Sequence, residues 1–342
     1  MSEGALYRKY RPQSFEEVRD QDHIVTVLQG AIKKETIPHA LLFSGTRGTG
    51  KTTLARIFAK AIGTVDLDVY EIDAASNRGI DDIRELKEAV HTLPYESKYK
   101  VYIIDEVHML TKEAFNALLK TLEEPPAHVV FILATTEEEK LLDTILSRCQ
   151  VFRFNSPSRA VLTQLAIDVA KKEGFEMSPE AADLIALAAD GSFRDALGII
   201  QKVILASGDK IGEADEVATI IGAPRTSTLL ALLDAFHTKD KEKALTTMSE
   251  ISAQPIDIKL FMRLLLEHVR AVMLLRNLPG QKDSILAAFG PETQDTLTSF
   301  MEGQTPINSH MLLRLLTAAE QTNRSPIPTL PLEIAIVEML EG

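Results

Sequence analysis

The segment from Gly45 to Thr52, GTRGTGKT, constrains the fold of this chain more than any other feature of its sequence. It fits the pattern G-x-x-x-x-G-K-[ST] and separates an apolar run at 40–44 from an amphipathic stretch at 52–62. Glycines let backbone N–H groups wrap around phosphates, and the N-terminus of the following helix favours negative charge. The pattern predicts a phosphate loop that binds ATP, with Lys51 on the β- and γ-phosphates and Thr52 on Mg²⁺.

Apolar strands alternate with helical stretches up to about residue 155. Four further short apolar runs, separated by amphipathic stretches, lie at 69–74, 100–106, 129–136 and 150–154. Such alternation is typical of an α/β domain whose parallel sheet is covered by crossover helices. From residue 158 onward only helical periodicity continues, with a Gly-Ala-Pro break at 222–224. We therefore expect three domains: α/β at 1–156, a small helical domain at 157–222 and a larger all-helical domain at 223–342.

A strand that ends in two acids is the second feature with a chemical meaning. The apolar residues 101–104 run directly into Asp105 and Glu106. Acids at the end of a buried strand are costly unless they serve a cation or a reaction. We expect Asp105 to hold Mg²⁺ through water, and Glu106 to orient or deprotonate the water that attacks the γ-phosphate.

Three residues near these strands have more than one interpretation. Thr136 ends the run at 129–136, and strand C-termini line the ligand crevice of a parallel sheet. Its hydroxyl either senses the γ-phosphate and positions water or caps the next helix. His108 is interpreted as packing or capping at the next helix start, with a part in the chemistry as the alternative. Cys149 is interpreted as a buried small hydrophobe rather than a nucleophile.

Two arginines are candidates for phosphate contact. Ser192 is typical of a helix N-cap, which places Arg194 in the first helical turn. A cation there opposes the helix dipole, and a nucleotide phosphate reached across a domain cleft would offset that cost. Pairing with Asp190 or Asp195 is the alternative. Arg148 follows a helix, and from the residues alone it is expected to pair with a carboxylate or a helix C-terminus.

Composition bounds the remaining possibilities. The chain has 342 residues, enough for two or three domains with sizeable cores. Its net charge of −12 argues against nucleic-acid binding through bulk charge, so any such contact must be local. A single cysteine excludes an internal disulfide and a cysteine-based zinc cluster. Because the N-terminus carries no apolar signal segment and no run of 18 apolar residues occurs, we expect a cytoplasmic protein without a membrane partner.

Eight segments together resemble the gamma/tau ATPase subunit of the bacterial DNA polymerase III clamp loader, within the AAA+ class. The resemblance is dense over 5–222 and weaker beyond it. The segments are YRKYRPQSFEEV, HALLFSGTRGTGKTT, VYEIDAASNRGIDDIREL, KVYIIDEVHML, FNALLKTLEEPP, FILATT, ILSRC and GSFRDAL. The resemblance implies a P-loop AAA+ parallel-sheet domain, followed by a small helical lid domain and an all-α collar domain through which subunits assemble.

Carried over by position, the resemblance also implies roles for single residues. Asp105 and Glu106 are the Walker B acids, Thr136 is the first sensor and Arg194, on the lid, is the second. Arg148, in the SRC motif, is an arginine finger that acts on the ATP of a neighbouring subunit. The residues implied to contact the nucleotide are Arg8, Arg11, Pro12, Gly45, Thr46, Arg47, Gly48, Thr49, Gly50, Lys51, Thr52, Thr53 and Arg194.

The resemblance implies macromolecular partners as well. Ser76, Asn77 and Arg78 open a helix and are implied to follow the phosphates of duplex DNA, a task that suits helix N-terminal amides and an arginine. The other implied partners are the remaining subunits of a hetero-pentamer, of delta and delta-prime types, the sliding clamp and primer–template DNA.

The chain departs from the family in one clear respect. The family usually inserts a four-cysteine zinc module before the strand at 69–74, whereas here only residues 63–68, GTVDLD, precede it. We therefore expect ATP and Mg²⁺ but no zinc. The chain also ends near the end of the third domain, so we expect the C-terminal extension of the tau form to be absent.

Two other functions compete with clamp loading. A DNA translocase or helicase of the branch-migration type shares the AAA+ core, but it needs a C-terminal winged-helix domain, whereas residues 223–342 are typical of a helical collar. A catalytically inactive subunit of the same loader is disfavoured by the intact phosphate loop and acid pair. The clamp-loader function predicts ATP hydrolysis without polymerase activity in this chain.

Overall fold

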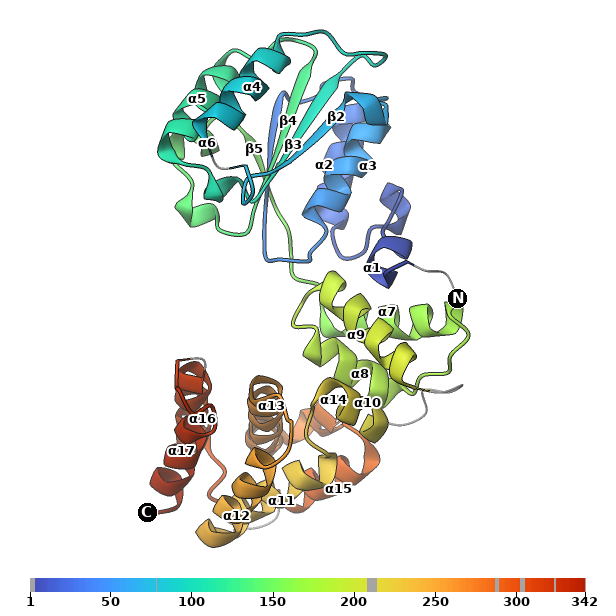
Figure 1. The fold of residues 1–342 in the computed structure, drawn as a ribbon. Coiled ribbons are helices and arrows are strands. Elements are labelled where there is room, and N and C mark those ends of the chain that lie inside the picture. The colour runs from blue at the N-terminus through green and yellow to red at the C-terminus, as the bar shows by residue number, and fades with distance from the viewer. Residues whose placement is uncertain are drawn as a thin grey trace. The chain divides into compact units, whose positions relative to one another are not determined.

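The computed structural model of the chain describes residues 4–77, 79–207, 214–286, 289–301, 305–322 and 324–341. These residues divide into two compact units, and Figure 1 labels most of their helices and strands. One unit runs through Leu162 and also holds Ala189–Gly198, and the other holds Thr163–Ala188 and the residues from Ile199 onward. The division into three domains at residues 156 and 222 stays a prediction.

The first unit is built on a five-stranded parallel sheet, as the alternation of strands and helices predicted. The strand order is β2-β3-β4-β1-β5. The strands are β1 (Ala40–Ser44), β2 (Val69–Asp73), β3 (Lys100–Asp105), β4 (Val129–Thr135) and β5 (Gln150–Arg153). β1 and β4 are buried along their whole length and β3 up to its last residue, whereas the edge strands are partly exposed. Apolar residues on both faces are expected of central parallel strands that are covered on both sides.

Two helical layers cover the two faces of the sheet. One layer consists of α4 (Ile80–Val90) and α5 (Lys112–Glu123), and the other of α2 (Asp22–Lys33) and α3 (Lys51–Ala61) (Figure 1). In β1, Leu42 packs with the first layer and Leu41 and Phe43 with the second, as the two-residue period of a strand requires. Helix α5 ends just before Pro125 and Pro126, as predicted.

Short elements complete the first unit. They are α1 (Leu6–Lys9), η1 (Phe15–Glu17), η2 (Asp66–Asp68), η3 (Val107–Met109), η4 (Glu138–Lys140) and α6 (Asp143–Leu146), where η denotes a 3-10 helix. Both η3 and η4 directly follow strands whose ends carry candidate site residues. They therefore set the direction in which the chain leaves the edge of the sheet.

The short junction at 63–68 is held in place by a buried carboxylate. Asp68 is fully buried and accepts the backbone N–H groups of Tyr95, Glu96 and Ser97 over 2.5, 3.0 and 2.8 Å. Burial raises the pKa of this carboxyl, but these three donors and the Ser97 hydroxyl together lower it further, to about 2. The segment between α3 and β2 is thus fastened to the loop before β3 by hydrogen bonds.

The residues that follow β5 are helical, as predicted, and no further strand occurs among the described ones. The longest helix, α13, carries buried Phe261, Leu265 and Val272 and packs against α16 in a large apolar core. No described helix is both long and apolar enough to cross a lipid bilayer. The helices are α7 (Arg159–Lys172), α8 (Pro179–Ala188), α9 (Phe193–Ala206), α10 (Ala214–Ile221), α11 (Thr226–Thr238), α12 (Lys241–Ser252), α13 (Ile258–Asn277), η5 (Pro279–Gln281), α14 (Lys282–Leu286), α15 (Pro291–Ser299), α16 (Ser309–Thr322) and α17 (Leu330–Leu340).

Candidate nucleotide-binding site

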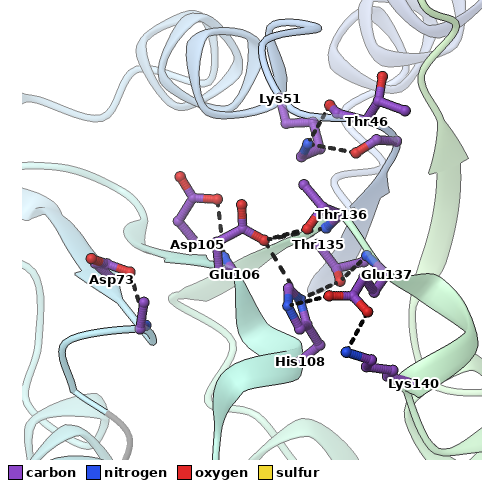
Figure 2. A network of polar contacts seen from close by, with 12 residues as sticks. Thr46, Lys51, Asp73, Asp105, Glu106, His108, Thr135, Thr136, Glu137 and Lys140 are labelled. Atoms are coloured by element: carbon purple, nitrogen blue, oxygen red, sulfur yellow. Dashed lines mark hydrogen bonds and ion pairs between the residues drawn. The ribbon is translucent and has the colours of Figure 1, made fainter. Parts of the chain in front are cut away.

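The C-terminal ends of β1, β3 and β4 bring the candidate residues to one edge of the sheet. β4 lies between β1 and β3, and its last residue, Thr135, pairs with Ser44 at the end of β1. The end of β4 therefore lies between the phosphate loop, which follows β1, and the acid pair, which begins at the last residue of β3. Figure 2 shows Lys51, Glu106 and Thr136 gathered at this edge.

The phosphate loop places Lys51 at the first residue of α3. Gly48 and Gly50 adopt φ angles of 78° and 102°, which side chains with a Cβ rarely tolerate. The Lys51 ammonium donates to the carbonyls of Gly45 and Thr46 over 2.7 and 2.8 Å. Burial lowers the pKa of Lys51, while the nearby carboxylates of the acid pair oppose that shift. A buried ammonium on backbone carbonyls can exchange them for phosphate oxygens, which accept its protons more strongly.

The residues expected to hold Mg²⁺ lie together. The Thr52 hydroxyl donates to Asp105 Oδ2 over 2.8 Å, and the Glu106 N–H donates to Asp105 Oδ1 over 3.0 Å. Mg²⁺ is usually bound through one or two protein oxygens, with water and substrate phosphate completing its shell. Among the described residues, no group of three or more histidine, cysteine or acidic side chains could hold a metal ion. The pair of Thr52 and Asp105 fits a phosphate-bound Mg²⁺ rather than a cage built only from protein.

Glu106 is bonded to the end of β4. It adopts a φ of 50°, which turns the chain from β3 into η3. Its Oε2 accepts the hydroxyl of Thr136 over 2.8 Å and the N–H of the same residue over 3.3 Å. The two residues assigned to water activation and to the first sensor are therefore in direct contact.

His108, for which packing or capping was the favoured interpretation and a part in the chemistry the alternative, also lies in this cluster. Its side chain is 5 % exposed, and Nδ1 lies 2.9 Å from Thr135 Oγ1 and 3.5 Å from Glu106 Oε2. The interpretation of His108 as a packing residue is therefore incomplete, because its ring contacts the hydrolysis residues. Its position two residues after Glu106 was the only signal in the sequence, since the contact with Thr135 depends on which strand lies beside β3.

Arg194 lies close to the phosphate loop. The Ser192 hydroxyl accepts the N–H of Asp195 over 3.1 Å, which confirms the predicted N-cap of α9. The N–H of Phe193 donates to the Gly48 carbonyl over 3.0 Å and joins the start of α9 to the loop. Burial is the main cause of the lowered pKa of Lys51, and the positive charge of Arg194 lowers it further.

Arg11 extends this group of cations. Its pKa is lowered by burial first, and then by the charges of Arg56 and Arg194. Arg194 therefore repels both Arg11 and Lys51, and such a group of cations fits a polyanion such as a triphosphate. Of the other residues implied to contact nucleotide, Arg8 and Arg47 are exposed, and Pro12 and Thr53 are partly buried.

Arg148 has a partner within its own chain. Its guanidinium donates to Glu123 Oε1 over 2.5 Å and to the Thr144 carbonyl over 2.6 Å. This is the arrangement expected from the residues alone, and the trans role that the resemblance implies stays a prediction. The neighbouring Cys149 is partly rather than fully buried and packs against the core, and burial raises the pKa of its thiol to about 11, which fits a small hydrophobe better than a nucleophile.

The turn implied to contact DNA is ordered by Asp73 at the end of β2. The Asp73 carboxylate accepts the N–H of Ala75 and the hydroxyl of Ser76, and its carbonyl accepts the Asn77 amide. Ser76 is exposed and Asn77 is partly buried. Arg78 lies outside the described residues.

Comparison with known proteins decides the family. Three family models match in succession: "DNA polymerase III, delta subunit" at residues 63–158, "DNA polymerase III clamp loader subunit, ATPase lid domain" at 161–209, and "DNA polymerase III subunits gamma and tau domain III" at 213–341. DNA polymerase III subunit gamma of Buchnera aphidicola subsp. Schizaphis graminum is 33% identical over 92% of this chain and 92% of its own length. This chain belongs to the DNA polymerase III gamma/tau family.

Longer members of the gamma/tau family are similar as well. DNA polymerase III subunit tau of Bacillus subtilis is 37% identical over 100% of this chain and 64% of its own length. The tau subunit of Escherichia coli is 37% identical over 84% of this chain and 48% of its own length. The chain thus spans about half to two thirds of the length of these tau relatives.

Solved structures support the fold of this gamma/tau chain. The Thermotoga maritima RuvB Holliday junction branch migration motor has a TM-score of 0.53 and 21% sequence identity, over 67% of this chain and 80% of that one. At this identity the likeness concerns the fold alone. It supports the arrangement of the parallel sheet with its covering helices.

Proposed function

We propose that this chain is an ATP-hydrolysing motor subunit of a DNA sliding-clamp loader, which places the clamp on primer–template DNA during replication. The observation that carries the proposal is the meeting of three features at one edge of the sheet. These are the Lys51 ammonium on the phosphate loop, the pair of Thr52 with Asp105, and the pair of Glu106 with Thr136. Together with membership of the gamma/tau family, this arrangement supports an active subunit rather than an inactive structural one.

The residues divide the work of hydrolysis between them. Lys51 exchanges the carbonyls of Gly45 and Thr46 for the β- and γ-phosphates of ATP. Thr52 and Asp105 would hold Mg²⁺, which would supply positive charge to neutralise those phosphates. Glu106 orients or deprotonates the attacking water. Thr136, whose hydroxyl donates to Glu106, acts as the first sensor of the γ-phosphate.

Two arginines connect hydrolysis to the rest of the assembly in this proposal. Arg194, at the start of α9 and close to Lys51, contacts a phosphate of the nucleotide as the second sensor. Arg148, which is 31 % exposed and held by Glu123, serves the ATP of a neighbouring subunit. Each site would then be complete only when a second subunit supplies its arginine.

The C-terminal helices support assembly. Leu313 and Leu316 on α16 and Leu330 and Ile334 on α17 are exposed, although the two helices pack against each other. Large apolar side chains exposed on packed helices favour burial against another protein. We propose that these side chains contribute to a hetero-pentamer with delta- and delta-prime-type subunits, in the bacterial cytoplasm.

A contact with DNA completes the proposal. The ordered turn with Ser76 and Asn77, together with Arg78, would contact duplex phosphates at the start of α4. Such a local contact suits a chain whose net charge is −12. A branch-migration translocase is not favoured, because residues 213–341 match the model of gamma and tau domain III.

Two variants test whether the site binds and hydrolyses ATP. We expect Lys51→Ala to lose ATP binding, and Glu106→Gln to keep it while turnover falls about 100-fold or more in the assembled complex. Binding of a fluorescent ATP analogue and phosphate release measure the two steps separately. Wild-type turnover in Glu106→Gln would contradict the assignment of the base, and unchanged binding in Lys51→Ala would contradict the location of the site.

A further inference from the structure

The imidazole of His108 is enclosed by polar groups from two other segments. It lies in η3, directly after the acid pair, and only 5 % of its side chain is exposed. On one side Nδ1 faces Thr135 Oγ1 at 2.9 Å and Glu106 Oε2 at 3.5 Å, and on the other Nε2 lies 3.3 Å from Glu137 Oε1 (Figure 2). Both ring nitrogens are thus engaged by side chains at the ends of β3 and β4.

The contacts of Glu106 are concentrated on one carboxylate oxygen. Oε2 receives the Thr136 hydroxyl at 2.8 Å and the Thr136 N–H at 3.3 Å, and His108 lies within 3.5 Å of the same atom. Within the part of the chain that the structure describes, no residue donates to Oε1. A carboxylate held through one oxygen keeps the lone pairs of the other for a water molecule.

The far side of the imidazole is anchored as well. The buried Thr135 hydroxyl accepts the N–H of Glu137 over 3.0 Å while it contacts His108 Nδ1. Glu137 is paired with Lys140. The hydrogen bond from Lys140 is the main cause that lowers the pKa of the Glu137 carboxyl, so this carboxyl remains an anionic acceptor. The ring is therefore fixed by a backbone turn and a charged side chain rather than by apolar packing alone.

We propose that His108 is a positioning residue for ATP hydrolysis. With Nε2–H directed at Glu137 and Nδ1 against the Thr135 hydroxyl, its ring fixes the end of β4, where Thr136 donates to Oε2 of Glu106, so that Oε1 is left for the attacking water. The inference rests on the proposed ATPase function and deepens it. It adds a connection, from Glu137 through His108 and the end of β4 to Glu106, that lies wholly within the protein.

A pair of substitutions separates positioning from packing. His108→Leu fills a similar volume without a hydrogen-bonding group, whereas His108→Asn carries an amide nitrogen near the place of Nδ1. Thr135→Val keeps its shape and removes the hydroxyl. Glu137→Ala removes the partner of Nε2, and Glu138→Ala is its matched control, because Glu138 pairs with Arg153 instead.

The experiment measures kcat and KM for ATP in the assembled complex, with binding of a fluorescent ATP analogue and the melting temperature of each variant. Misplacing a base by about an ångström costs on the order of 10- to 100-fold in rate, so we expect His108→Leu to lower kcat by that factor. ATP affinity should change less than about twofold, because the ring does not touch the phosphate loop. His108→Asn should recover most of the rate, Thr135→Val and Glu137→Ala should lose part of it, and Glu138→Ala should lose none.

Several results would overturn the proposal. One is a wild-type kcat in His108→Leu, and another is an equal loss in the leucine and asparagine variants that follows their melting temperatures. If His108→Leu does not fold, wild-type kcat in both Thr135→Val and Glu137→Ala contradicts the proposal by itself. Failure of the proposed function looks different, because the wild-type complex would then turn over ATP no faster than Glu106→Gln.

Discussion

The hydroxyl of Thr52 donates to Asp105 Oδ2 across 2.8 Å and so joins the first turn of α3 to the end of β3. The two residues are 53 positions apart in the sequence, and the parallel sheet brings them together. Both atoms are hard oxygen ligands of the kind that Mg²⁺ prefers. Their contact marks the place where the metal that accompanies ATP is expected to bind.

Thr52→Val tests this location. The variant keeps the shape of the side chain and removes one oxygen ligand, so we expect ATP affinity in the presence of Mg²⁺ to fall about tenfold or more. Affinity in EDTA should change little, since the phosphate loop itself is intact. Titration of a fluorescent ATP analogue in the two buffers gives the comparison. Thr26→Val, on the exposed face of α2, is the control, and equal Mg²⁺ dependence in all three proteins would place the metal elsewhere.

Gly48→Ala tests the contact between the phosphate loop and α9. The φ of Gly48 is 78°, and a Cβ there would lie 1.9 Å from the buried Ser192 hydroxyl that caps α9. We expect the free energy of unfolding to fall by about 1–3 kcal/mol and ATP affinity to fall with it. Gly30→Ala, in α2 with open space around it, should instead gain about 0.5–1 kcal/mol. Chemical denaturation measures both, and equal stabilities of the two variants would refute this account of the loop.

Asp68→Asn tests the junction between α3 and β2. The pKa of Asp68 is about 2 in the folded protein against an ordinary value of 3.8, so its ionised form stabilises the fold by about 2 kcal/mol above pH 4. That contribution disappears as the pH falls through 2. We expect Asp68→Asn to be less stable by about this amount at pH 7, with a difference from wild type that shrinks between pH 4 and pH 2. Exposed Asp66→Asn serves as the control, and a pH-independent difference for Asp68→Asn would show that its charge is not responsible.

The sheet and the main site residues were predictable because their signals are local. A glycine-rich loop between a strand and a helix, and two acids after an apolar run, each occupy fewer than ten consecutive residues. The identity of Lys51, Asp105 and Glu106 as candidates needed no knowledge of the tertiary structure. The N-cap at Ser192 was predictable for the same reason, since a cap acts within one helical turn.

The contacts that local patterns did not indicate join distant segments. His108 meets Thr135 only because β4 lies beside β3, and Phe193 meets Gly48 across 145 positions of sequence. Strand order and the path of a helix after the sheet are set by the packing of the whole unit, not by neighbouring residues. Asp68 was assigned to a plain connecting segment, although its carboxylate organises residues 95–97.

Arg148→Ala tests whether this arginine acts on a neighbouring subunit. The side chain is paired with Glu123 in its own chain, so ATP binding by the variant should be unchanged. Turnover stimulated by clamp and DNA in the assembled complex should fall by about 10³-fold or more if the guanidinium stabilises the transferred phosphoryl group. Arg153→Ala, which loses an exposed pair with Glu138, is the matched control. Unchanged stimulated turnover in Arg148→Ala would rule out the trans role.

The most direct test of the clamp-loader function is ATP turnover by the chain assembled with its delta- and delta-prime-type partners, measured with and without a sliding clamp and primed DNA. We predict that clamp and primed DNA together stimulate turnover well above the level of either alone, and that Glu106→Gln removes the stimulation. Turnover that is the same with and without clamp and DNA, in a complex that binds ATP normally, would contradict the proposed function.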